Sequence, residues 1–203
     1  MKRKLADPDY YCIGCKRDPI VGWVRQYPRV GEVPWYCGSC HAVNRLENHR
    51  EVPITGVPRG VISYLDEPEL GLIHEDLIRA LGVDRVHAHL SLRPVLNMRG
   101  KVVVGWSSFV GRYRTIVRGT AHAGVRACEE CGNPLYFAMP PDYLHPRPEA
   151  GVDILDAGAG RLVIPKDLFE GIHVEGWKGL ACTPLPVLDP PPDGLGLLPY
   201  PSW

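Results

Sequence analysis

The chain has 203 residues, which is enough for one large domain or two small ones with a buried core. Its 23 Lys and Arg residues equal its 23 Asp and Glu residues, so the formal net charge is zero, unlike the strong basic bias that is typical of nucleic-acid-binding domains. Glycine (22) and proline (21) are both more frequent than in an average domain, which favours turns, short elements and irregular connections.

The sequence gives no sign of a membrane span or a secretory leader. No window approaches the run of about 20 apolar residues that a membrane-spanning helix needs. The charged start Met1–Lys4 leads into Asp7-Pro8-Asp9 and not into an apolar stretch. We therefore expect a protein without a membrane span that stays in the cytoplasm.

Six of the seven cysteines fall in three Cys-x-x-Cys pairs, which are Cys12/Cys15, Cys37/Cys40 and Cys128/Cys131. A tight turn between two cysteines places both thiolates at neighbouring corners of a tetrahedron, and a second pair completes a structural zinc site. The odd total and this pattern are unlike a secreted disulfide scaffold and favour metal ligation in a reducing compartment. The first two pairs, separated by 21 residues, therefore predict a site of four thiolates for Zn²⁺.

The use of the third pair stays open. Two thiolates do not complete a tetrahedron, so Cys128 and Cys131 need further ligands to hold a second ion, for which His122, His145 and Cys182 are candidates. For the four N-terminal cysteines, the alternative to zinc is a set of free thiols or a redox pair, which more typically lies at a helix N-terminus. We expect one or two structural Zn²⁺ ions that contribute to folding.

The N-terminal pairs define the expected domain organisation. Residues 20–30 are rich in β-branched and aromatic side chains and predict a strand that Pro28 interrupts. Residues 1–50 are thus expected to form a zinc-ribbon-like segment. Residues 51–203 are expected to form an α+β domain that carries the third pair, unless the two parts make one integrated domain.

The middle of the chain predicts one helix followed by strands. The spacing of apolar residues from Leu70 to Leu81 favours an amphipathic helix that starts near Asp66–Glu69 and ends at Gly82. Alternating patterns then predict strands at 87–93, 101–106 and 109–117, with a turn at 97–100. We expect these strands to form an antiparallel meander with one buried face.

The C-terminal part predicts a strand, a short helix and a second strand. Residues 134–148 form a proline-rich loop, 161–164 a strand, 165–170 one or two helical turns ended by Gly171, and 172–175 a strand. The expected fold class is therefore α+β, with N-terminal zinc-ribbon-like knuckles joined to an antiparallel sheet and one or two short helices.

No catalytic arrangement is evident. The paired acids Asp153/Asp156 and Glu129/Glu130 lack a matching base or nucleophile, and such pairs mostly lie at the surface. His87 and His89 fall on one face of a predicted strand, where a polar sheet face is more common than a metal site. The arginines near Tyr113 suit a solvated face better than a nucleic-acid platform. We therefore expect a protein that is not an enzyme.

Three stretches give the chain a resemblance to the double-CXXCG motif family, a paralogous family found mainly in myxobacteria. The first is Cys12-x-x-Cys15 with the following Val21-Gly22 and Tyr27–Val30, and the second is Cys128-Glu-Glu-Cys131-Gly132. The third is the ending, from Val152–Asp156 through 162–164 to 171–176. The chain departs from the family pattern at Lys16, which replaces the glycine of the first motif, and Cys37 and Cys40 are additional.

The resemblance implies a function and a second ligand set. Some members of the family act as immunity proteins that protect a cell from a toxin delivered by its kin. The two family motifs would place Cys12/Cys15 and Cys128/Cys131 on one ion and leave Cys37/Cys40 outside it. Closing the longer loop costs only a little more entropy, so both ligand sets stay open.

Metal spacing and the lack of a catalytic arrangement together predict a zinc-stabilised binding protein, and the resemblance implies that its partner is a toxin. The alternative is a nucleic-acid- or transcription-associated zinc ribbon that uses Arg25, Arg29 and Arg45, which the neutral charge disfavours. A metalloenzyme needs an open coordination position, and four thiolates leave none.

Overall fold

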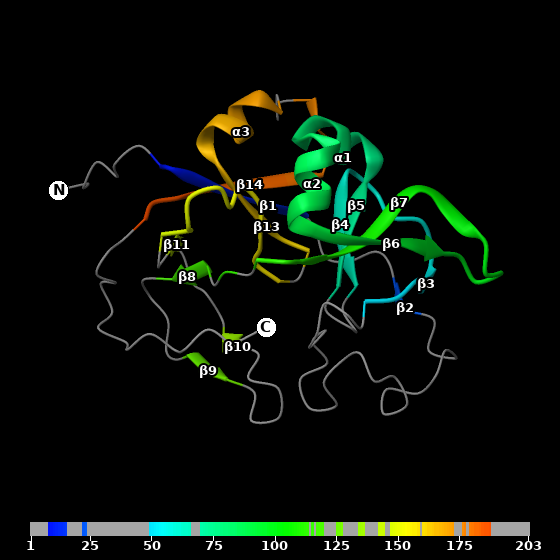
Figure 1. The fold of residues 1–203 in the computed structure, drawn as a ribbon. Coiled ribbons are helices and arrows are strands. Elements are labelled where there is room, and N and C mark those ends of the chain that lie inside the picture. Colours follow the sequence, from blue (N-terminus) through cyan, green and yellow to red (C-terminus); the bar gives the residue numbers. More distant parts are fainter. Residues whose placement is uncertain are drawn as a thin grey trace.

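The computed structural model describes residues 8–15, 22–23, 49–65, 70–113, 115, 117–119, 125–127, 134–136, 142–144, 147–158, 160–172, 176–177 and 179–187. In these residues the protein is a sheet-rich α+β fold with few helices, which confirms the coarse fold class expected from the sequence. Figure 1 shows the helices lying along one side of the strands. Most of the predicted zinc-ribbon segment lies outside the described residues.

The first sheet has four strands in the order β12-β13-β1-β14. Strand β1 (Tyr10–Cys15) lies between β13 (Leu162–Pro165) and β14 (Leu180–Leu185) and runs antiparallel to both. Strand β12 (Leu155–Asp156) pairs with the outer edge of β13. This sheet therefore joins the N-terminal cysteine segment to the end of the described chain.

The second sheet has six strands in the order β2-β3-β6-β7-β5-β4. All neighbours are antiparallel except β3 and β6, which are parallel. The bounds are β2 Gly22–Trp23, β3 Val52–Thr55, β4 Ile62–Leu65, β5 Leu70–His74, β6 Leu90–Leu96 and β7 Val102–Gly111.

Two further strand pairs are short. Strand β8 (Val117–Gly119) pairs with β11 (Asp142–Leu144), and β9 (Val125–Ala127) pairs with β10 (Pro134–Tyr136), both antiparallel. The region predicted as a proline-rich loop thus contributes two short strands.

The helices are α1 (Glu75–Leu81), α2 (Val83–His89) and α3 (Lys166–Gly171). His74 caps α1, because its Nδ1 accepts a hydrogen bond from the backbone N–H of Asp76 at 3.3 Å. Gly82 ends α1 with a φ of 89°, and its N–H donates to the carbonyl of Arg79. A glycine tolerates this backbone conformation, which explains why the helix ends where the sequence predicted.

Side chains from both sheets and all three helices meet in one main core. Its residues alternate with outward-facing positions on the strands and occupy the inner face of each helix. Burial of this apolar surface is the main stabilising contribution to the fold. The buried members of the main core are Ile13, Ile62, Ile73, Leu77, Leu81, Val86, Leu90, Phe109, Ile154, Leu162, Ile164, Leu168, Ile172 and Leu180.

Two smaller clusters lie apart from the main core. The second cluster belongs to the six-stranded sheet and contains Val52, Ile54, Leu65, Leu70, Leu72, Val95, Trp106 and Val110. The third cluster is built around the four-stranded sheet and contains Cys12, Leu144, Leu155, Ala157, Val163 and Leu185.

The helix predicted from Leu70 is wrong in its first half. Leu70–His74 is the strand β5, and its first four residues are all buried. A strand buried on both faces gives a continuous apolar run, which a helical spacing can match by chance. Only Glu75–Leu81 forms the predicted helix.

The first predicted strand of the meander is also partly wrong. His87 and His89 belong to helix α2, and strand β6 begins only at Leu90. The turn at 97–100 and the strand after it are confirmed, although β7 continues to Gly111 and includes the start of the predicted third strand. The β6–β7 pair is antiparallel as expected.

Near the C-terminus, strand β13 and helix α3 confirm the predicted strand and helical turns. Ile172 closes α3 instead of starting a strand, and residues 173–175 lie outside the described residues. Strand β14 was not predicted, because Leu180–Leu185 contains a proline and has no regular alternation.

Candidate functional site

Two of the predicted zinc ligands lie on strand β1. Cys12 is 8% exposed and packs in the third cluster, where it pairs with Val163 and Thr183 of the flanking strands. Cys15 is the last residue of β1, is half-buried, and pairs with Leu180. The segment between them is extended, whereas a metal knuckle has a tight turn.

The strand conformation places the two thiols on different faces of the sheet. Side chains alternate along a strand, so residues three positions apart point in opposite directions. Ile13 belongs to the main core and shares its face with Cys15, while Cys12 faces the third cluster. Binding of one ion by both thiolates therefore requires the backbone at Gly14–Cys15 to turn out of the strand.

The remaining predicted ligands, Cys37, Cys40, Cys128 and Cys131, lie outside the described residues, as do His122 and His145. Within the described part of the chain, no group of three or more metal-binding side chains comes together. Cys182 lies opposite Ile13 on β14, and burial raises the pKa of its thiol. The structural zinc site stays a prediction.

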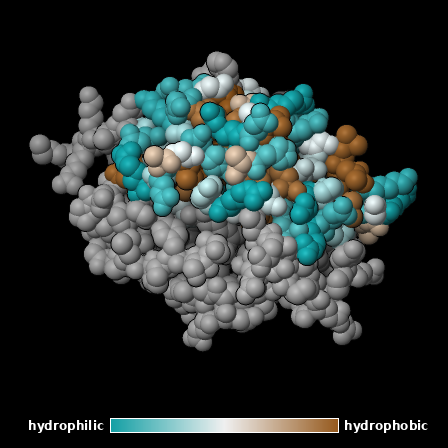
Figure 2. All heavy atoms as spheres, in the orientation of Figure 1, coloured by the Kyte–Doolittle hydropathy of each residue, from teal (hydrophilic) through white to brown (hydrophobic). Residues whose placement is uncertain are grey.

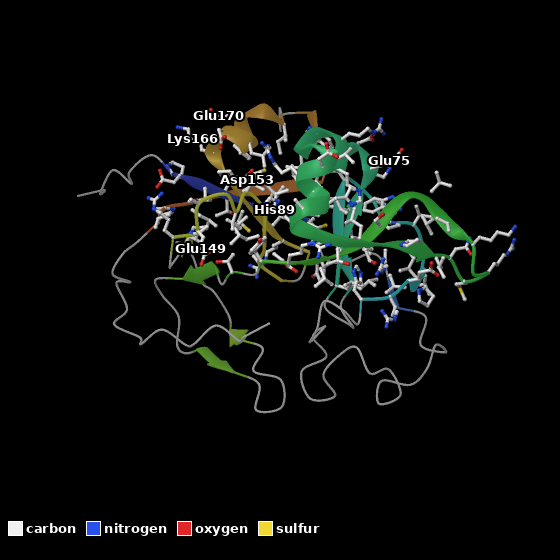
Figure 3. All side chains as sticks on the ribbon, viewed as in Figure 1. Glu75, His89, Glu149, Asp153, Lys166 and Glu170 are labelled. Atoms are coloured by element: carbon white, nitrogen blue, oxygen red, sulfur yellow. The ribbon has the colours of Figure 1, made fainter. Side chains whose placement is uncertain are left out.

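The histidine pair of the sequence does not form a metal site. His87 is exposed and His89 is buried at the end of α2, so the two side chains do not share a face. The Nδ1 of His89 donates to the carbonyl of Arg85 at 2.8 Å, and its Nε2 accepts from the N–H of Asp153 at 3.2 Å. His89 therefore ties α2 to residues 151–153 (Figure 3).

The acid pair Asp153 and Asp156 also has structural contacts. Asp153 forms an ion pair with Arg85, at 3.1 Å between Nε and Oδ2. Asp156 is only 5% exposed, and its carboxylate accepts from the N–H groups of Gly111 and Gly158 at 2.9 and 2.8 Å. The expectation that such acids lie at the surface is wrong for Asp156, because backbone donors compensate its burial.

A buried histidine that the sequence did not reveal joins the strands of the hairpin. The side chain of His49 is fully buried, with Nδ1 3.1 Å from the Ser91 hydroxyl on β6 and Nε2 2.9 Å from the Ser108 hydroxyl on β7. The Ser108 hydroxyl also donates to the carbonyl of Arg93. These contacts are consistent with a neutral ring whose Nε2–H donates to Ser108 and whose Nδ1 accepts from Ser91.

Burial lowers the pKa of His49 to about 4, and the positive charges of Arg93 and Arg50 contribute in the same direction. The Nε of Arg93 donates to the His49 carbonyl at 3.1 Å, so the guanidinium is held close to the ring. His49 and Ser108 are both fully buried, which keeps a substrate from reaching this histidine–serine contact. The network is thus a structural link and not a catalytic pair.

The described surface has one prominent apolar feature, the outer part of the β6–β7 hairpin. We call residues 97–105 the arm. Met98, Val102 and Val104 of the arm are 71%, 58% and 87% exposed. Figure 2 shows hydrophobic surface at the right-hand end of the molecule, where Figure 1 draws this hairpin. Val103 is the exception, because it packs against the second cluster.

The arm bends away from the sheet at Gly105. Pro94 pairs with Ser107 and Leu96 with Val102, so β7 carries extra residues opposite Val95 and forms a bulge. Gly105 has a φ of 80°, and a Cβ at this position would lie 2.7 Å from Nε2 of His74. Only glycine fits both the conformation and the contact.

One edge of the arm is open. Strand β5 pairs with β7 only as far as the His74–Trp106 pair. Among the described residues, no strand pairs with Val102–Gly105 on the side of β7 that faces away from β6. This edge therefore offers backbone N–H and C=O groups to another chain.

The side chain of Asn97 holds the tip of the arm. Its Oδ1 accepts from the N–H groups of Arg99 and Lys101 at 2.8 and 3.1 Å, and its backbone N–H donates to the Lys101 carbonyl. A preformed tip loses less conformational entropy when it binds a partner.

We expect Asn97→Ala to loosen the tip by about 1 kcal/mol, because both backbone donors lose their acceptor. Faster amide hydrogen exchange at Arg99 and Lys101 measures this change. Asn97→Asp is the matched control, since it keeps an acceptor oxygen and should preserve slow exchange. Equal exchange in the alanine variant and in the unmodified chain would contradict the role of Asn97.

Comparisons with known proteins found no matching protein-family model and no matching curated protein. No helix among the described residues is long and apolar enough to cross a membrane.

Proposed function

We propose that this chain is a cytoplasmic binding protein that acts by stoichiometric contact with a protein partner through the arm. The observation that carries the proposal is the exposure of Met98, Val102 and Val104 together on a preformed hairpin. Apolar side chains at a surface cost free energy in water, and a cluster of them is typical of a binding surface. The described polar networks support binding over catalysis, because they are buried or fully used in structural contacts.

We further propose that the partner is a toxin and that the chain acts as an immunity protein. The resemblance of its first and third cysteine pairs and of its C-terminal elements to the double-CXXCG family supports this class of partner. An immunity protein needs a rigid surface that blocks its toxin and does not need chemistry of its own. The arm, anchored by His49 and the Gly105 bulge, supplies such a surface.

The test is co-expression of this chain with the proteins encoded by the genes on either side of its own, one of which we expect to be the toxin. The unmodified protein should restore growth and co-purify with the toxin at equal stoichiometry. The double variant Val102→Ser/Val104→Ser should lose most of this protection because it removes the apolar contact. Val57→Ser is the matched control, since Val57 is 67% exposed in the loop between β3 and β4. Full growth of cells that carry the toxin but lack this protein would overturn the proposal.

The zinc prediction has its own test. We expect the purified protein to contain stoichiometric zinc and to unfold at lower temperature after chelation, because metal binding contributes folding free energy. Cys→Ser variants at positions 12, 37 and 128 separate the two ligand sets by showing which pairs are needed for the same ion. Cys182→Ser is the control outside the three pairs. A metal-free protein with unchanged stability would contradict the prediction.

A further inference from the structure

The arm lies within a stretch of the sequence that has an excess of positive charge. From Arg85 to Cys128 the sequence contains no Asp or Glu, although the whole chain is neutral. The same stretch contains eight cationic residues, which are Arg85, Arg93, Arg99, Lys101, Arg112, Arg114, Arg118 and Arg126. The neutral total thus conceals a basic stretch of sequence, to which the arm contributes Arg99 and Lys101.

In the described part of the chain, basic residues on the helices form ion pairs, whereas those of the arm form none. Arg79 pairs with Glu75 and Asp76 on α1, and Lys166 lies 3.8 Å from Glu170 on α3. Figure 3 shows Lys166 and Glu170 on α3, away from the hairpin, and Glu75 at the start of α1. Arg99 and Lys101 are exposed, and among the described residues neither is part of an ion pair.

Apolar side chains, cations and an open strand edge therefore occur together in the arm. Val102 and Val104 lie on one face of β7, Val103 on the other face packs against the second cluster, and Lys101 directly precedes the strand. A strand added at this edge would place every second residue beside the two valines. A carboxylate of this added strand that lies beside the start of β7 would be near Lys101, where negative charge is favoured.

We propose that the arm binds an extended, acidic segment of a partner protein, which adds as a strand beside Val102–Gly105. Apolar residues of this segment contact Val102 and Val104, and its alternate carboxylates lie near Lys101 and Arg99. This inference rests on the proposed function, because it names the chemistry of the partner at the same surface. The toxin of such a pair would present an acidic strand or tail.

The charge of the arm disfavours the other occupants. A second copy of this chain would bring another positively charged arm to the same edge, and like charges repel. Nucleic acid would satisfy the cations, but its binding surfaces use polar and aromatic side chains, whereas the arm exposes methionine and valine. A protein segment with both apolar and acidic residues matches all three features.

The test is a titration of the ¹⁵N-labelled full chain with three short peptides of equal length. One alternates Val and Glu, one alternates Val and Lys, and one alternates Ser and Glu. We expect the Val/Glu peptide to shift the amide signals of Met98–Gly105 and to slow their hydrogen exchange. It should bind at least about 10-fold more tightly than either comparison peptide, and salt should weaken it.

Two variants assign the contacts. Arg99→Glu/Lys101→Glu should reverse the preference toward the Val/Lys peptide, and Val102→Ser/Val104→Ser should abolish binding of the Val/Glu peptide. Arg59→Glu and Val57→Ser are the matched controls, because both residues are exposed outside the arm, and they should leave binding unchanged. Unfolding curves of all four variants check that the fold is retained.

Three outcomes overturn the inference. The arm signals do not shift with the Val/Glu peptide, they shift equally with all three peptides, or a single-stranded oligonucleotide displaces the Val/Glu peptide from the arm. These outcomes are distinguishable from failure of the proposed function. If the protein binds the Val/Glu peptide at the arm but gives no protection against the toxin, the result supports this inference and contradicts the immunity role.

Discussion

Acidification from neutral pH to about pH 4 is expected to lower the free energy of unfolding by about 3 kcal/mol through His49 alone. The cause is the difference between the ordinary pKa of a histidine, 6.5, and the value of about 4 in the folded protein. Between these two values the unfolded chain binds a proton on His49 that the folded protein does not bind. Stability is therefore fully present above about pH 6.5 and decreases as the pH falls toward 4.

The structure explains why protonation is unfavourable at this site. A second N–H would appear on Nδ1, where the Ser91 hydroxyl now donates, and the new charge would be buried near Arg93 and Arg50. Because His49 links β6 to β7, its loss should loosen the base of the arm before the main core unfolds. Hydrogen exchange at Ser91 and Ser108 measures this loosening.

Chemical denaturation at a series of pH values provides the measurement, with two variants for comparison. His49→Gln removes the titrating group and should flatten the pH dependence between 4 and 6.5. His87→Gln is the matched control, since His87 is exposed on α2, and it should keep the dependence of the unmodified chain. An NMR titration that places the pKa of His49 near 6.5 would show that the ring is not held neutral by burial.

Gly71→Ala is expected to destabilise the fold by about 2 to 3 kcal/mol. Gly71 on β5 lies directly opposite Phe109 on β7, and the phenyl ring covers the position that a Cβ would occupy. Phe109 is 1% exposed in the main core, so its ring has no free space into which it can move. An added methyl group would therefore overlap the ring, so that either the ring or the two strands must move.

A double variant isolates this contact. Phe109→Leu alone should cost about 1 kcal/mol, because it removes part of a buried ring. Gly71→Ala/Phe109→Leu should be more stable than Gly71→Ala, since the smaller side chain makes room for the methyl group. Gly171→Ala is the control at the end of α3, where a Cβ meets no atom within 4 Å. Additive effects of the two substitutions would contradict the proposed overlap.

The sequence predicted the fold best where one local signal decided the structure. Gly82 ended α1 and Gly171 lay at the end of α3, because glycine ends a helix irrespective of distant contacts. Leu70–His74 was assigned wrongly, because it forms a strand only by pairing with β4 and β7, which flank it in the sheet. Strand β14 was missed for a similar reason, since only pairing with β1 makes Leu180–Leu185 a strand.

The candidate site was less predictable than the fold. Nothing near His49 in the sequence marks it as buried, because its partners Ser91 and Ser108 are far along the chain. The valines of β7 indicated a strand, but their exposure depends on the bulge at Gly105 and on where β5 ends. Charge counted over the whole chain also concealed the basic stretch of sequence that contains the arm. Sequence patterns report local preference, whereas exposure and pairing are properties of the assembled sheets.

The position of β1 has a consequence for how the protein folds during synthesis. This strand leaves the ribosome first among the described elements, yet both of its neighbours, β13 and β14, come from residues 162–185. The nascent chain therefore carries an unpaired strand until nearly all described elements have been made. Some side chains of this strand are buried in the folded protein. Long-range pairing of this kind slows folding and exposes an edge that can aggregate. Expression of a chain truncated before Leu180 should accordingly yield mostly insoluble protein.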